Sequence, residues 1–151
     1  MEVFRITHKK WSNKLIASGY AARWNSTGFF VIYTAENCSL ACLENLVHRN
    51  GFGSNIDYCV MTIFIPNSIK ISEIKIADLP KKWNKTNEEG HLLCRDIGDK
   101  WLQIMGSSVL IVPSAIIPNE KNILINPNHI DFQKIVIQST TDFSFDSRLL
   151  L

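Results

Sequence analysis

Residues 28–48, with the sequence GFFVIYTAENCSLACLENLVH, contain the two neighbouring patterns that decide the fold. The apolar, aromatic and β-branched run Phe29–Thr34 has the composition of a buried strand. The segment Ser39–Asn50 predicts a helix, for which Asn37 and Ser39 are both suitable N-caps. The stretch therefore predicts a buried strand that leads directly into a helix.

Outward from this stretch, the hydrophobic pattern predicts further strands and one more helix. The expected strands are Val3–Thr7, Cys59–Ile65, Ile69–Ile76, Val109–Val112, Asn122–Asn126 and Lys134–Gln138, with an edge strand around Phe143 and Phe145. Residues 8–27 predict a long loop or a broken helix. Thr86 and Glu89 fit a capping box, and the helix behind it would present one apolar face made of Leu93, Ile97, Trp101 and Ile104 or Met105.

The order of these elements favours one fold class. Strands and helices do not alternate regularly, so a doubly wound parallel sheet is not supported. We expect a mixed α/β (α+β) fold, with a mixed β-sheet core and flanking helices. The 151 residues are expected to form a single domain over 1–151, with a core at about 3–138 and a C-terminal tail at 139–151.

Composition excludes several classes of function. Hydrophobic residues make up 46% and charged residues 20%, which is typical of a globular chain. The net charge of +2, with no basic run longer than a pair, argues against nucleic-acid binding. The apolar runs are too short for a membrane span, and MEVFRITHKKW lacks a signal-peptide core, so we expect a cytoplasmic protein. The four cysteines form no CxxC pair, so we expect no metal site and reduced thiols.

Glu44 is a carboxylate at an unexpected place in the predicted helix. It falls beside the apolar stripe of Leu40, Leu43 and Val47 instead of opposite to it. The side chain could simply bend out to water at the border of that stripe. Alternatively, it could form a cleft wall, where a carboxylate stabilises a developing cation.

Three more residues are candidates, each with an ordinary alternative. Arg23 could bind a phosphate with its planar fork, or lie over the ring of Trp24. Tyr33 ends a strand, where ligands often bind, but it could equally be a core tyrosine. Ser114 follows an apolar strand and could present its hydroxyl to a pocket, although no GxSxG motif surrounds it.

Taken in order, several motifs resemble the RES-domain family, which is named after Arg, Glu and Ser. The resemblance runs from about Val3 to Ile137 and rests on FRI, ARWNSTGFFVIYTAENCSLACLENLVH, DLPKKW, GDKWL and VLIVPSAIIPNEKNILINPNHIDF. It implies an ADP-ribosyltransferase-like fold and the toxin of a type II toxin–antitoxin pair. Such a toxin destroys cellular NAD+ by hydrolysis or phosphorolysis, so NAD+ would be a substrate and inorganic phosphate a potential co-substrate, with no cofactor.

The resemblance also implies roles for individual residues. Glu44 would stabilise the cationic sugar, and Arg5 and Arg23 would hold the diphosphate. Tyr33 would wall in the nicotinamide, and Ser114 would hydrogen-bond the ribose or the amide. An Xre-like antitoxin would be the partner, without direct nucleic-acid or membrane binding, and a homodimer would be unsurprising.

Two other functions stay open on these residues. One is a mono-ADP-ribosyltransferase that modifies a macromolecule, because the same pocket would serve. The other is a catalytically inactive protein-binding module. Its one hint is Ala21-Ala22, where many members of the family carry two glycines. No GxGxxG motif follows a strand, so a redox dinucleotide fold is not indicated.

Overall fold

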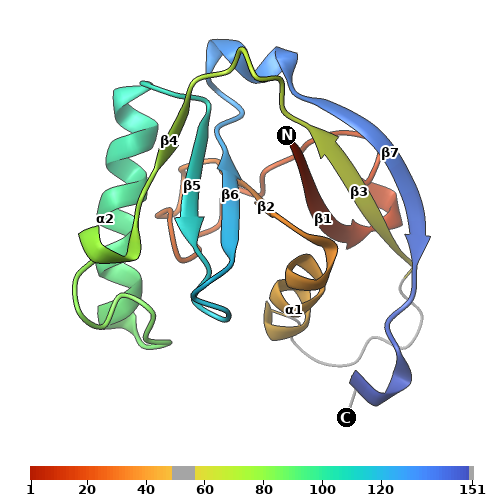
Figure 1. Cartoon of the computed structure of the whole chain (residues 1–151), viewed down its shortest axis with the longest axis horizontal. Coiled ribbons are helices and arrows are strands. Elements are labelled where there is room, and N and C mark those ends of the chain that lie inside the picture. Colours follow the sequence, from red (N-terminus) through yellow and green to blue (C-terminus); the bar gives the residue numbers. More distant parts are fainter. Residues whose placement is uncertain (49–56, 150–151) are drawn as a thin grey trace.

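A mixed sheet forms the centre of the computed structural model, which describes residues 1–48 and 57–149 (Figure 1). Within these residues seven strands lie in the order β4-β5-β6-β2-β1-β3-β7, and only the pair β4–β5 is parallel. The strands are β1 Glu2–His8, β2 Ile32–Ala35, β3 Tyr58–Phe64, β4 Ile71–Glu73, β5 Val109–Pro113, β6 Lys121–Ile125 and β7 Val136–Phe143. The helices are α1 Cys38–His48 and α2 Glu88–Ile104, with short 3-10 turns at Lys9–Trp11, Ile76–Asp78, Ile130–Lys134 and Ser147–Leu149.

The sheet consists of two parts whose strands are joined by a single pair of residues. β1 and β2 are neighbours, but their register contains the single pair Phe4–Ala35. By contrast, β1 pairs with β3 along its whole length, from Glu2 to His8. The part β4-β5-β6-β2 and the part β1-β3-β7 therefore splay apart on either side of this seam (Figure 1).

Both helices lie on the same face of the sheet. Val112 pairs with Asn122, Asn122 with Ala35, and Ala35 with Phe4, so these four side chains share one face. On this face α2 packs over β5 and β6, and α1 packs over β2 and β1. The opposite face carries a separate isoleucine-rich core, which includes Ile32, Ile63, Ile123 and Ile125. Full burial of each such side chain is worth about 1.5–3 kcal/mol.

Helix α1 begins where the sequence predicts, but it is rotated about its axis. Asn37 is the N-cap, and its Oδ1 accepts from the backbone N–H of Leu40 at 2.8 Å, so Ser39 is not the cap. The expected apolar stripe is wrong: the buried residues are Leu40 and Ala41, whereas Leu43 is 36% and Val47 63% exposed. The predicted end at Asn50 lies outside the described residues.

Helix α2 also differs in detail from the prediction. Its N-cap is Asn87, which accepts from Gly90 N–H at 3.1 Å, so the capping box of Thr86 and Glu89 is wrong by one residue. The predicted apolar face is rotated, because Ile104 and Met105 are exposed. The buried residues are Gly90, Cys94, Gly98, Trp101 and Leu102. The sequence favours this face because the two glycines let the helix approach neighbouring backbone.

The strand predictions hold in position more than in length. β2 begins at Ile32, since the chain first makes a turn that contains Gly28 at φ +90°, and residues 29–31 that follow it are irregular. β4 retains only Ile71–Glu73 of the predicted strand. The two strands expected near the C-terminus are one edge strand, β7, with a bulge opposite Thr62 and Ile63. Residues 139–143, expected in the tail, are thus part of the sheet.

Candidate active site

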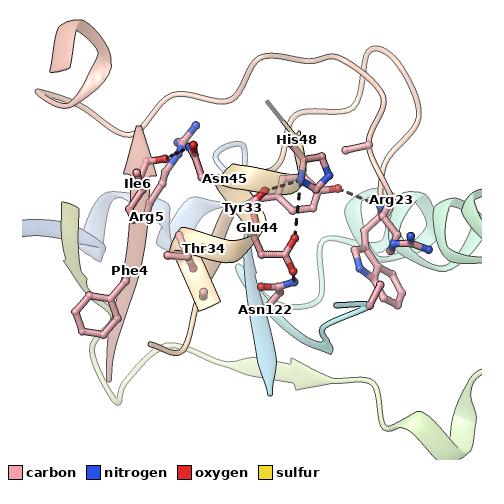
Figure 2. Close-up of a pocket in the computed structure, with 15 residues that line it drawn as sticks. Phe4, Arg5, Ile6, Arg23, Tyr33, Thr34, Glu44, Asn45, His48 and Asn122 are labelled. Carbon is pink, nitrogen blue, oxygen red and sulfur yellow. Dashed lines mark hydrogen bonds and ion pairs between the residues drawn. The ribbon is translucent and has the colours of Figure 1, made fainter. Parts of the chain in front are cut away.

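A cavity of about 320 Å³ opens over the seam of the sheet, between α1 and the loop before β2 (Figure 2). One face of α1 lines it, since Ala41, Glu44, Asn45 and His48 follow the i, i+3, i+4, i+7 spacing. The other walls come from Phe4, Arg5 and Ile6 of β1, from Ala22, Arg23 and Trp24, from Tyr33, Thr34 and Ala35 of β2, and from Ala115 and Asn122. The rotation of α1 thus turns Glu44 inward.

Glu44 is held by one donor on β6 and another directly after β5. Its Oε1 accepts from the Asn122 amide at 2.5 Å and from the Ser114 hydroxyl at 3.0 Å. Its Oε2 lies 3.9 Å from His48 Nδ1. Figure 2 shows the carboxylate between His48 and Asn122, and the side chain is 24% exposed. A carboxylate fixed in this way at a cavity wall can stabilise positive charge that develops on a ligand.

Ser114 lies behind Glu44 and not in the cavity wall. It follows β5 and is fully buried. Its Oγ donates to Glu44 and accepts from the backbone N–H groups of Ile116 and Ile117, both at 3.1 Å. The structure therefore brings Ser114 to the predicted site through Glu44, while its predicted contact with substrate stays a prediction.

The Tyr33 hydroxyl supports the loop that carries Arg23. It donates to Asn25 Oδ1 at 2.7 Å and accepts from Trp24 N–H at 3.0 Å. Burial raises the pKa of this hydroxyl, and the bond from Trp24 offsets part of the rise. The ring lines the cavity while the hydroxyl stays protonated and engaged. The Tyr33 ring can therefore form part of the cavity wall, while its hydroxyl is bonded to Trp24 and Asn25.

The loop around Arg23 is fastened to α2. Arg95 Nε donates to the Ala22 carbonyl at 2.9 Å, and Asp99 Oδ1 accepts from Ser26 N–H at 2.9 Å. Arg23 itself donates to the carbonyls of Trp83 and Lys85, at 2.9 and 3.1 Å. Its guanidinium thus sits at the α2 side of the cavity, with backbone oxygens as its present partners.

Arg5 lies across the cavity from Arg23, with Glu44 between them in the view of Figure 2. Its Nη1 donates to the Ile16 carbonyl at 2.8 Å. Burial lowers the pKa of Arg5 from its ordinary value, but an arginine stays charged at neutral pH. The arrangement places one cation on each side of the carboxylate, which suits an extended anionic ligand.

Sequence reasoning missed four polar residues that line the cavity: Thr34, Asn45, His48 and Asn122. Asn45 Nδ2 donates to the Ile6 carbonyl at 3.1 Å, which ties α1 to β1. His48 Nδ1 donates to the Glu44 carbonyl at 2.7 Å, since a carbonyl oxygen can only accept. The available signals were an Asn at an inward position of a strand, and a His four residues after Glu44.

Two further findings concern ligands and membranes. Within 1–48 and 57–149, no three His, Cys, Asp or Glu side chains are grouped as a metal site would require. In the same residues, no helix has the length and apolar character needed to span a membrane.

The fold and the cavity together define the class of protein. This is a mixed α/β single domain of the ADP-ribosyltransferase-like type, as predicted, with a carboxylate held at a cavity over the seam. The family model of the RES domain matches residues 2–146. The chain therefore belongs to the RES domain family, and the predicted membership is confirmed.

Curated relatives cover nearly the same length. Toxin Res of Photorhabdus laumondii is 35% identical over 156 residues, which are 99% of this chain and 97% of the relative. Toxin Res of Yersinia enterocolitica is 36% identical, over 88% of this chain and 86% of the relative. The Prs ADP-ribosylating toxin of Sphingobium sp. is 32% identical, over 85% of this chain and 80% of the relative.

Proposed function

We propose that this protein is a cytoplasmic toxin that depletes NAD+ by cleaving the bond between nicotinamide and ribose. The observation that carries the proposal is the Glu44 carboxylate, fixed by Ser114 and Asn122 at the cavity wall. Relatives named Toxin Res along almost the whole chain support the toxin role. NAD+ would be consumed as a substrate, and the reaction needs no further cofactor.

The reaction develops positive charge on the ribose, beside the bond that breaks. As the bond from C1′ to the nicotinamide nitrogen breaks, its electron pair neutralises the pyridinium ring, and the ribose becomes oxocarbenium-like. A carboxylate beside the sugar stabilises that transition state more than the ground state. Water or inorganic phosphate then adds to C1′ and loses a proton, which gives ADP-ribose or its phosphate ester.

The other residues would bind and orient the dinucleotide. Arg5 and Arg23 would share the diphosphate, and Arg23 would exchange its bonds to the carbonyls of Trp83 and Lys85 for phosphate oxygens. The Tyr33 ring would wall in the nicotinamide. Ser114 would act on the ribose through Glu44, since its hydroxyl is buried behind that residue.

The test is NAD+ consumption by the purified protein, followed by chromatography with and without phosphate. We expect Glu44→Gln to abolish the loss of NAD+ while its melting temperature stays near that of the wild type. Glu89→Gln, which changes an exposed carboxylate on α2 paired with Lys82, is the matched control and should stay active. Wild-type consumption in Glu44→Gln would refute the role of Glu44.

A second candidate function is transfer of ADP-ribose to a macromolecule. The relative named Prs ADP-ribosylating toxin favours it, and the same carboxylate would serve. Incubation with adenine-labelled NAD+ and cell extract separates the two functions. Transfer leaves label on protein or nucleic acid, whereas degradation leaves it only in small products.

We also propose that an Xre-like antitoxin neutralises the protein, and a homodimer would be in keeping with the family. Co-expression with its Xre-like antitoxin should restore growth, and the two proteins should co-purify. Growth arrest that persists with the antitoxin present would contradict this partnership.

A further inference from the structure

Asn122 helps to fix Glu44, but the proposed mechanism gives no role to the choice of carboxylate oxygen that Asn122 contacts. The residue is 9% exposed, and its amide donates to Oε1 of Glu44, the oxygen that also accepts from Ser114. The nitrogen of the amide must face the carboxylate, because a carboxylate oxygen can only accept. Two donors, one on β6 and one directly after β5, thus converge on one oxygen of the carboxylate.

The two oxygens of Glu44 are consequently unequal. Oε1 has two donors, whereas Oε2 lies 3.9 Å from Nδ1 of His48, beyond hydrogen-bond distance. We propose that Asn122 is a positioning residue that holds Oε1 so that Oε2 faces the substrate. This inference rests on the proposed function, since it assigns a role in the same site.

The place of Asn122 in the sheet suits this role. It pairs with Ala35 of β2 on one side and with Val112 of β5 on the other, so its backbone lies between two strands. Glu44 comes from α1, on a side chain with three rotatable bonds. Ordering such a side chain costs rotamer entropy, and this cost is already met in the folded protein before the substrate binds.

An amide also differs usefully from an acid at this position. It donates without carrying charge, so it fixes the carboxylate and leaves its negative charge available to the substrate. In Asn122→Asp, an ionised aspartate of the same shape would repel Glu44. When the two carboxylates share one proton, the aspartate can again donate a hydrogen bond to Glu44. The isosteric variant therefore behaves differently at different pH values.

The kinetic test compares Asn122→Ala and Asn122→Asp with Asn126→Ala, which removes a buried amide from the other end of the same segment. We expect Asn122→Ala to lower kcat roughly ten- to a hundredfold, with KM changing less than about threefold. Asn122→Asp should match that loss near pH 8 and regain activity as the pH falls to about 6. Asn126→Ala should keep the wild-type kcat.

Several results would overturn the positioning role. These are an effect on KM alone, equal losses in Asn122→Asp and Asn122→Ala at every pH, or an equal loss in Asn126→Ala. Crystal structures of the wild type and Asn122→Asp give a readout that needs no activity: Glu44 should leave its wild-type position at pH 8 and return at pH 6. If the wild type consumes no NAD+, the proposed function fails and these structures alone decide the role of Asn122.

Discussion

Gly98 of α2 should be intolerant of even one added methyl group. A Cβ at this position would lie 1.8 Å from the Trp24 carbonyl oxygen, whereas Cβ atoms essentially never approach within 3.0 Å. Helix and loop must therefore separate by more than about 1 Å, or the loop must deform. An alanine in a helix is normally more stabilising than a glycine, by about 1 kcal/mol. The close approach makes Gly98→Ala destabilising instead.

We expect Gly98→Ala to lower the free energy of unfolding by about 2–3 kcal/mol, which is the upper part of the range of about 1–3 kcal/mol for overpacked cores. For a chain of this length the melting temperature should fall by about 5–10 °C in circular dichroism. NAD+ consumption should fall as well, because the displaced loop carries Arg23. Gly106→Ala is the control, since its Cβ would meet only Ile104 Cγ2 at 3.5 Å. A Gly98→Ala protein that melts at or above the wild-type temperature would refute the reasoning.

Two further predictions concern the loop and its support. Arg23→Ala should raise KM for NAD+ about tenfold with a smaller effect on kcat, because a charged hydrogen bond to the diphosphate is lost; unchanged saturation kinetics would remove Arg23 from that role. Tyr33→Phe should lower the free energy of unfolding in urea by about 1–3 kcal/mol, since Trp24 N–H and Asn25 Oδ1 lose their partner. Burial raises the pKa of Tyr33, so its stabilisation is complete below about pH 10 and is lost as the pH rises through the folded value. Between about pH 8 and pH 11 the wild type should therefore lose more stability than Tyr33→Phe, and equal losses would contradict this assignment.

The sequence predicts the elements well because their hydrophobic patterns are local. β1 and β3 differ from the predicted strands by one residue at either end, and Asn37 was one of the two predicted caps. The rotation of α1 could not be read in the same way. Leu43 and Val47 are apolar yet exposed, while Glu44 turns inward to donors that lie about 70 residues further along the chain.

The site shows the same division between local and distant information. Tyr33, Glu44, Arg5 and Arg23 were named from the sequence, and all four line one cavity. Asn122 was not named, because its role depends on a strand pairing that no local pattern encodes. The signal that it does leave in the sequence is a polar residue at an inward position of an otherwise apolar strand.

The seam at Phe4 and Ala35 has a consequence for how the protein is inactivated. The cavity belongs to neither part of the sheet, because its walls come from β1 on one side and from β2 and β6 on the other. Local openings in proteins occur in cooperative units of unequal stability. Because each part supplies walls of the cavity, we expect a heated sample to lose its activity no later than it loses the sheet.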